Sequence, residues 1–180
     1  RLSSCQDTLE NMRGTIRTLL DLYKVKSGLI KLKKEDHNLV KIIDEKMEEF
    51  EPLFKEKGIR CLKRDFKGGL VIKVDKDKFK EIINNLFSNF LKYTPQGGWI
   101  EIGFSSTRDF ARLEFVNSSQ IIPEDKLGLI FEKFRKLDEN KEGSGLGLAI
   151  SRDIADLHGG SLWAENLPKG VIFVLILPCA

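Results

Sequence analysis

Residues 1–27 carry apolar side chains in two rows of a heptad repeat. One row takes every seventh residue from Leu2 to Tyr23, and the other, offset by three, runs from Cys5 to Leu19. Positions a and d of a coiled-coil helix have this spacing. A lone helix cannot bury such a face. The pattern therefore predicts one helix of a bundle, and the alternative is a terminal helix folded onto its own domain.

After Gly28 short strand patterns alternate with longer amphipathic helix patterns. Helices are predicted over about 39–57, 77–93 and 145–157. Strands are predicted over 29–37, 59–66, 70–74, 99–106, 110–117, 161–165 and 171–177. Asp75 or Asp77 is the expected N-cap of the longest helix. The turn signal Lys67-Gly68-Gly69 predicts a hairpin between the second and third strands.

Strand pairs separated by single long helices indicate an α+β fold. We expect a two-layer α/β sandwich in which helices cover one face of a mixed sheet, preceded by one long bundle helix. A doubly wound parallel sheet is excluded because the short links between strands leave no room for crossovers. The expected domains are a bundle helix at 1–28 and a globular domain at 29–180, joined by a hinge at Val25–Gly28.

Composition narrows the range of partners and compartments. With 41% hydrophobic residues the chain can build a core, and 30 basic against 27 acidic residues give a net charge of only +3, which argues against a nucleic-acid partner. No apolar run approaches the roughly 20 residues of a membrane helix, so no membrane contact is expected from this segment. Three widely spaced cysteines and two histidines argue against a disulfide framework or a zinc site and favour a reducing compartment.

A polar row occupies one side of the helix predicted after Asp75. Asn85, Asn89 and Lys92 recur at spacings of four and three, so they share one face, away from the apolar one. Amide oxygens suit Mg²⁺, and an adjacent ammonium suits phosphate oxygens. By spacing alone the row is better explained as a solvated helix face.

A second candidate is Gly143-Ser144-Gly145-Leu146-Gly147-Leu148, where alternate glycines lead directly into a helix. Backbone N–H groups without side chains around them can close on phosphate, and the helix dipole adds to the attraction. The segment lacks the Lys of a P-loop and does not follow a strand as a dinucleotide fingerprint does. Alone, it is a weak signal.

Together these segments resemble motifs of sensor histidine kinases. Asn85–Gly98 resembles the N box of that family, Phe131–Phe134 the F box and Gly143–Ile150 the G2 box, while His158–Gly160 resembles the end of the helix that follows. The resemblance extends from about Leu29 to the last residue and implies a Bergerat-type ATP-binding fold. Residues 1–28 resemble the second helix of the family's dimerisation and phosphotransfer hairpin.

The resemblance also implies roles for individual residues. Asn89 would hold Mg²⁺, Asn85 and Lys92 would face the phosphates as the catalytic residues, and Tyr93 would flank the nucleotide. Residues 135–142 would form the ATP lid. The implied nucleotide-binding residues are Asn85, Asn89, Lys92, Tyr93, Asn117, Ile122, Phe134, Gly143, Ser144, Gly145, Leu146, Gly147 and Leu148.

One motif departs from the family. Its G1 box, Asp-x-Gly-x-Gly-Ile-Pro, would fall on 117–123, where Asn117 replaces the Asp, and Ser119 and Ile121 replace the glycines. In the family that Asp accepts a hydrogen bond from the adenine amino group, and a neutral amide gives a weaker bond. We expect a loss on the order of 1 kcal/mol, or about tenfold in affinity.

Neither histidine fits the family's acceptor pattern, because His37 precedes Asn38 and His158 precedes Gly159. The expected function is therefore the ATP-binding catalytic part of a two-component sensor histidine kinase, which transfers the γ-phosphoryl group of ATP to a His on an upstream helix. A homodimer through the bundle helix, a response-regulator receiver domain as partner and a cytoplasmic location are implied, and membrane anchoring of the full-length protein stays open. The alternative is a degenerate relative that signals by docking and binds ATP weakly or not at all.

Overall fold

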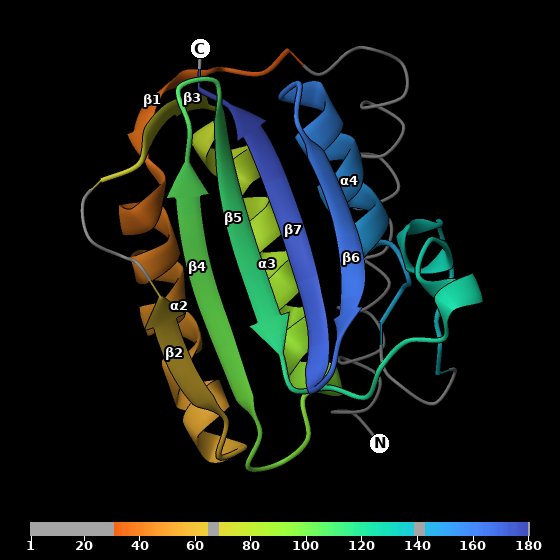
Figure 1. The fold of residues 1–180 in the computed structure, drawn as a ribbon. Helices are drawn as coiled ribbons and strands as arrows, with labels where there is room; N and C mark the ends of the chain where they lie inside the picture. The colour runs from red at the N-terminus through yellow and green to blue at the C-terminus, as the bar shows by residue number, and fades with distance from the viewer. Residues whose placement is uncertain (1–30, 65–68, 139–142, 180) are drawn as a thin grey trace, which may run out of the picture. The chain divides into compact units, whose positions relative to one another are not determined.

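The computed structural model describes residues 31–64, 69–138 and 143–179 (Figure 1). The chain divides into two compact units, Arg1–Lys31 and Leu32–Ala180, and nearly all described residues belong to the second. The bundle helix predicted at 1–28, its hinge and the start of the first predicted strand lie outside the described residues.

A mixed five-stranded sheet forms one layer of this unit. Its strands stand in the order β2-β4-β5-β7-β6. Neighbours are antiparallel except for the edge strand β2, which runs parallel to β4. The strands are β2 (Arg60–Arg64), β4 (Trp99–Ser106), β5 (Phe110–Asn117), β6 (Ser161–Leu167) and β7 (Gly170–Pro178).

Helices form the second layer and cover one face of the sheet. They are α2 (Leu39–Glu56), α3 (Lys76–Tyr93) and α4 (Gly147–Leu157), and the 3₁₀ turns η1 (Glu124–Lys126) and η2 (Leu129–Phe131) lie between β5 and α4. Figure 1 shows α3 lying behind the central strands. This arrangement confirms the predicted α+β two-layer sandwich. No helix in the described part of the chain is long and apolar enough to cross a membrane.

The central helix α3 is packed on both sides by aromatic rings. Phe87 meets Phe54 of α2 at a centroid distance of 5.8 Å, and Phe90 meets Phe173 of β7 at 5.9 Å. These rings are almost completely buried, so α3 is fixed between α2 and the sheet. The polar face of α3 then points along the remaining open side. The Asp75 carboxylate accepts a bond from the Lys78 N–H at 3.1 Å and begins the helix, as one of the two predicted caps.

The predicted hairpin between the second and third strands is wrong. β2 pairs with β4, whereas β3 (Val71–Val74) pairs with β1 (Glu35–Asn38) in a separate two-stranded sheet. The reason is burial: Ile72 and Val74 are buried, while every residue of β2 is exposed, so the two segments suit different environments. The local turn signal was overridden by these long-range pairings. α4 also begins at Gly147 rather than Gly145.

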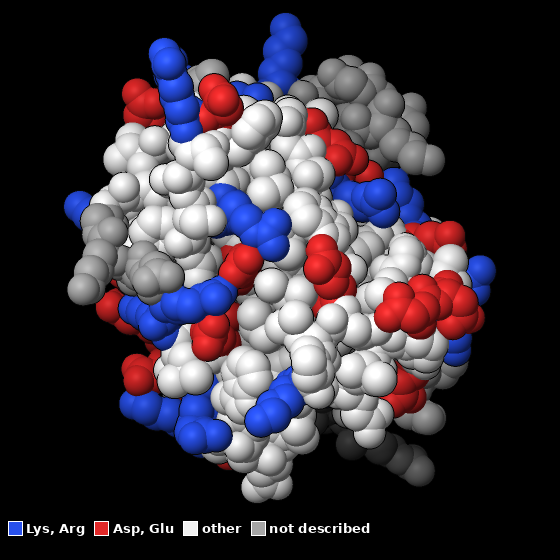
Figure 2. Space-filling view, viewed as in Figure 1, with Lys and Arg blue, Asp and Glu red and all other residues white. Residues whose placement is uncertain are grey.

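The face of the sheet opposite the helices has its own apolar cluster. Val116, Ile172 and Val174 are buried there under the partly buried rings of Trp99 and Trp163. Acidic and basic side chains are interspersed over this face in Figure 2. They include the ion pairs of Arg64 with Glu101 and Glu114, and those of Arg112 with Glu114. The two indole rings and the ion pairs therefore shield the cluster from water.

His158 joins the start of α3 to the end of α4. Its Nε2 accepts the Asp75 backbone N–H at 3.0 Å, and its Nδ1 donates to the Ile154 carbonyl at 2.8 Å. Both bonds require the neutral ring protonated on Nδ1. Burial lowers the pKa of His158; the Ile154 carbonyl and Asp75 carboxylate raise it, and the nearby Lys34 ammonium lowers it further, for a net decrease.

Replacing His158 with Gln is expected to lower the free energy of unfolding by about 1–3 kcal/mol near pH 7.5, because two buried hydrogen bonds are disturbed. Since the folded pKa lies below the unfolded value of about 6.5, the unfolded chain binds more protons as the pH falls through that range. The difference between wild type and H158Q should therefore shrink as the pH falls below about 6.5. Urea denaturation at several pH values measures it, with H37Q as the control, and a constant difference would contradict the assignment.

Candidate functional site

A cleft opens between the polar face of α3 and the segment that leads into α4. Its volume is about 1270 Å³, larger than the roughly 300–1,000 Å³ of common small-molecule pockets. The C-terminal half of α3 forms one wall, and residues 117–123 and 135–138 form others. Val171 and Phe173 of β7 contribute apolar surface. The cleft is thus long enough to hold a ligand with two chemically different ends.

Most of the predicted binding residues meet in this cleft although they come from three separate segments, 85–93, 117–122 and 143–148. Those that line it are Asn85, Asn89, Lys92, Tyr93, Asn117, Ile122, Gly143, Ser144, Gly145, Gly147 and Leu148. Leu146 is not among the lining residues, because its side chain is fully buried at the start of α4. Phe134 is also outside the lining and is 60% exposed.

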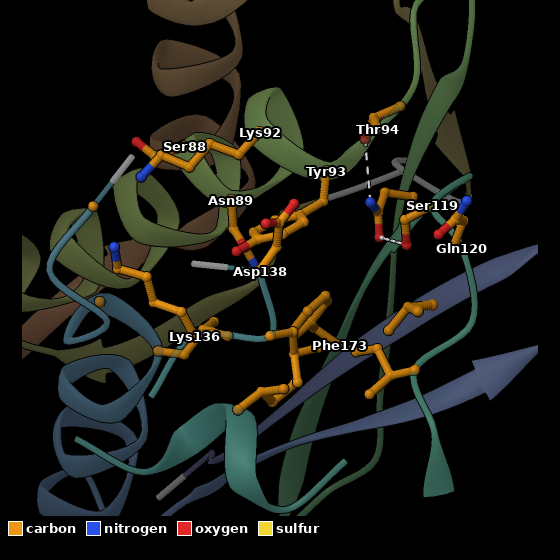
Figure 3. A pocket seen from close by; sticks show the side chains of 18 of the residues that line it. Ser88, Asn89, Lys92, Tyr93, Thr94, Ser119, Gln120, Lys136, Asp138 and Phe173 are labelled. Atoms are coloured by element: carbon orange, nitrogen blue, oxygen red, sulfur yellow. Dashed lines mark hydrogen bonds between the residues drawn. The ribbon is translucent and has the colours of Figure 1, made fainter. Parts of the chain in front are cut away.

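One end of the cleft, the glycine end, is formed by Gly143–Leu148 together with Lys92. A Cβ on Gly143 would lie 2.9 Å from the Lys92 Nζ, so the ammonium lies directly against the glycine backbone. The first N–H groups of α4 also begin here, and they give a helix N-terminus a partial positive charge. In Figure 3 the side chains of Lys92 and Lys136 extend toward the same side of the cleft. This end suits a polyanion.

The Asn85 side chain fixes the relative position of α3 and α4 at this end. Its Nδ2 donates to the Gly147 carbonyl at 3.0 Å and to the Ser151 Oγ at 3.1 Å. Because a carbonyl can only accept, the orientation of the Asn85 amide is settled, and its Oδ1 is the atom left for other partners. A Cβ on Gly147 would approach the Asn85 side chain to 3.3 Å, so a larger residue there would press on this amide.

Asn89 and Tyr93 occupy the middle of the cleft, one and two turns further along α3. Figure 3 shows both side chains facing the interior beside Asp138. Burial raises the pKa of the Tyr93 hydroxyl, and the negative charge of Asp138 raises it further. Tyr93 therefore stays a neutral hydrogen-bonding ring at neutral pH.

The far end, here called the amide end, contains a buried Asn117. Its Nδ2 lies 3.2 Å from the Thr94 Oγ1, and the Ser119 Oγ lies 3.4 Å from its Oδ1, as the dashed lines in Figure 3 indicate. Apolar side chains of Ile122 and Phe173 line the same cleft. Sequence reasoning treated Thr94 only as the end of a helix and missed Phe173. β7 is an almost uninterrupted apolar strand that is buried on both faces, so its sequence does not distinguish Phe173 from its neighbours.

The backbone at the glycine end includes two residues with left-handed dihedrals. Phe134 has φ of 63° and Gly145 has φ of 69°. The Phe134 N–H donates to the Gly145 carbonyl at 3.0 Å, so the two segments bind each other directly. Residues 139–142 of the predicted lid lie outside the described residues, and Lys136, Leu137 and Asp138 of the same prediction line the cleft.

A family model described as "Histidine kinase-, DNA gyrase B-, and HSP90-like ATPase" matches residues 74–180. The chain belongs to this family. The matched region includes α3, the cleft and the whole sheet except β2. Most of the described cleft therefore lies within the ATPase domain of the family.

Named relatives narrow the class within this family. Sensor histidine kinase WalK of Bacillus subtilis is 27% identical over 180 residues, which cover 96% of this chain and 29% of WalK. Adaptive-response sensory kinase SasA of Rippkaea orientalis is 30% identical over 171 residues, covering 93% of this chain and 44% of SasA. The chain thus spans less than half the length of these curated relatives.

Solved structures agree with the sequence relatives. The nucleotide-free catalytic domain of histidine kinase ThkA is 31% identical with a TM-score of 0.75, covering 82% of this chain and 97% of that one. ThkA in complex with response regulator protein TrrA matches at 26% identity and a TM-score of 0.75, over 94% of this chain and 49% of that one. The predicted ATP-binding catalytic domain of a sensor histidine kinase is confirmed, and nothing in these comparisons favours the docking alternative.

Replacing Gly145 with Ala is expected to disrupt the glycine end of this ATPase-family cleft. A left-handed conformation costs an L-residue about 1–2 kcal/mol, and the new Cβ would lie 2.8 Å from the Arg135 carbonyl oxygen. The free energy of unfolding should fall by at least about 1 kcal/mol in urea denaturation. G128A is the matched control, because a Cβ there has nothing within 4 Å. Equal stability of G145A and G128A would contradict this account.

Proposed function

We propose that the cleft binds Mg-ATP with the triphosphate at the glycine end and the base at the amide end. The observation that carries this proposal is the charge of the walls. Asp138 is the only carboxylate among the described lining residues. The cationic lining residues are Lys57, Lys92, Lys126, Arg135 and Lys136. Such an excess of positive charge beside a helix N-terminus favours a polyanion.

The donor atoms at the glycine end fit a magnesium–phosphate group. We assign Mg²⁺ to the amide oxygen of Asn89, because neutral oxygens are suitable ligands and Mg²⁺ also binds phosphate oxygens and water. Lys92 would meet phosphate oxygens, since its ammonium lies 2.9 Å from the position that a Cβ of Gly143 would take. Asn85 contributes through its Oδ1 and by holding α4 in place.

Bound ATP would supply a γ-phosphoryl group, which leaves the β-phosphate oxygen and releases ADP. The residues of this chain position the group and balance its charge. An amide cannot take a proton from water, so Asn85 provides no general base for hydrolysis. Transfer to an imidazole nitrogen needs a weaker base than hydrolysis by water does, and it is therefore the favoured reaction.

We also propose the wider setting of this reaction. The acceptor would be a histidine of an upstream helix in the complete protein, the helix at 1–28 would form part of a homodimeric bundle, and an Asp of a response-regulator receiver domain would receive the phosphoryl group next. The greater length of WalK and SasA and the ThkA–TrrA complex support this setting. Cys61 and Cys179 are free thiols, which supports a cytoplasmic location.

Titration of Mg-ATP into the purified chain tests the binding proposal. Replacing Asn89 with Ala should weaken Mg-ATP binding by about tenfold or more, equivalent to about 1.4 kcal/mol, because the proposed metal ligand is lost. N84A is the matched control, since Asn84 lies on the same helix and is not among the cleft-lining residues. Calorimetry measures both. No binding to the wild type at millimolar Mg-ATP, or equal affinities of N89A and N84A, would overturn the proposal.

The chain alone should not label itself with phosphate. The His158 ring nitrogens are both occupied by buried hydrogen bonds, and His37 lies in β1, which belongs to the two-stranded sheet and not to the cleft. Incubation with radiolabelled ATP, followed by acid and base treatment, checks for phosphohistidine. Base-stable, acid-labile label on this chain would contradict the assigned acceptor, and H37Q and H158Q would then locate it.

A further inference from the structure

The amide end of the cleft can present two different hydrogen-bonding faces to a ligand. Asn117 is 2% exposed and lines the cleft, so its amide is a buried polar group that a ligand in the cleft can reach. Its two partners are the hydroxyls of Thr94 and Ser119. A hydroxyl donates or accepts by rotating its hydrogen. Both orientations of the Asn117 amide are therefore satisfied by the same neighbours.

Asn85 shows what a fixed amide requires. There the partner of Nδ2 is a backbone carbonyl, which only accepts, so turning the amide would place two oxygens in contact. Asn117 has no carbonyl or charged group among its two hydrogen-bond partners. Its hydrogen bond with Ser119 is long, at 3.4 Å, and therefore weak, so replacing it when the amide turns costs little free energy. The orientation of Asn117 is consequently set by whatever lies against it.

A flat heterocycle is the part of a nucleotide that suits this end. The polyphosphate is drawn to Lys92 and the start of α4 at the glycine end, whereas Val171 lies opposite Asn117 in the β5–β7 pairing, and Ile122 and Phe173 add apolar surface to the cleft. Asp138, the only carboxylate of the described lining, acts on Tyr93, whose pKa it raises. The side chains that are hydrogen-bonded to one another at this end, Asn117, Thr94 and Ser119, are all neutral.

We infer that this cleft binds 6-oxo purine nucleoside triphosphates about as well as 6-amino ones, with Asn117 as the specificity-determining residue. The amide accepts from a 6-amino group through Oδ1 or donates to a 6-oxo group through Nδ2. Strong discrimination arises when the wrong ligand leaves a buried polar group unpaired. An amide that can turn to present either Oδ1 or Nδ2 avoids that penalty for both ligands. This inference rests on the proposed nucleotide site.

Paired titrations of Mg-ATP and Mg-ITP test the inference, because the two differ only at position 6 and its neighbouring N1. For the wild-type chain the dissociation constants should agree within about threefold, a small fraction of what a lost buried hydrogen bond produces. An acceptor-only side chain should restore discrimination. N117D is thus expected to favour ATP over ITP by about tenfold or more. N84D, which adds the same charge outside the cleft, should keep the wild-type ratio.

The outcomes separate the inference from the proposed function. Tight ATP binding with ITP at least about tenfold weaker in the wild type would overturn the inference and leave the nucleotide site standing. Equal ratios in wild type and N117D would overturn the role of Asn117. Failure of both nucleotides to bind the wild type would overturn the proposed function itself. The wild-type ratio decides the first point even where N117D does not fold.

Discussion

The contact between the Asn85 amide and the first turn of α4 is the interaction on which the cleft depends. Asn85 Nδ2 donates to both the Gly147 carbonyl and the Ser151 hydroxyl, and the Ser151 hydroxyl itself donates to the Gly147 carbonyl at 2.9 Å. One side chain of α3 therefore holds the helix end that supplies N–H groups to the glycine end. A Cβ on Gly147 would lie 3.3 Å from the Asn85 amide, so a larger residue would require that amide to shift. The Asn85 side chain, which lines the cleft, thus also holds α3 and α4 together.

The glycine end of the cleft is rigidly preorganised, whereas the amide end can adapt to its ligand. At the glycine end a backbone carbonyl, two left-handed residues and close approaches fix the geometry, which favours a ligand group of constant shape such as a polyphosphate. At the amide end hydroxyl partners leave Asn117 adaptable. A ligand with a constant tail and a variable base would match this division. The rigid part of the cleft is therefore the part at which the charge of the proposed polyphosphate would be balanced.

Local patterns predicted the helices and most strands, and long-range pairing decided what they missed. The three- and four-residue spacing of Phe79, Ile82 and Leu86 specifies α3 because one buried face is enough to define a helix. The local sequence does not specify which strands pair. It predicts a β2–β3 hairpin, whereas β2 pairs with β4 and β3 pairs with β1. The cleft was predictable through its motifs. Thr94 and Phe173 were not, because their roles arise from packing alone.

Strain at Phe134 explains why the glycine end needs more than one glycine. A left-handed conformation is unfavourable for an L-residue by about 1–2 kcal/mol, so other contacts must offset it. The bond from the Phe134 N–H to the Gly145 carbonyl does so. It forms only because Gly145, itself left-handed, brings its backbone within reach of Phe134 and Arg135. Gly145 is thus required by chain packing, because a Cβ there would lie 2.8 Å from the Arg135 carbonyl oxygen, whereas Gly143 and Gly147 approach only the side chains of Lys92 and Asn85.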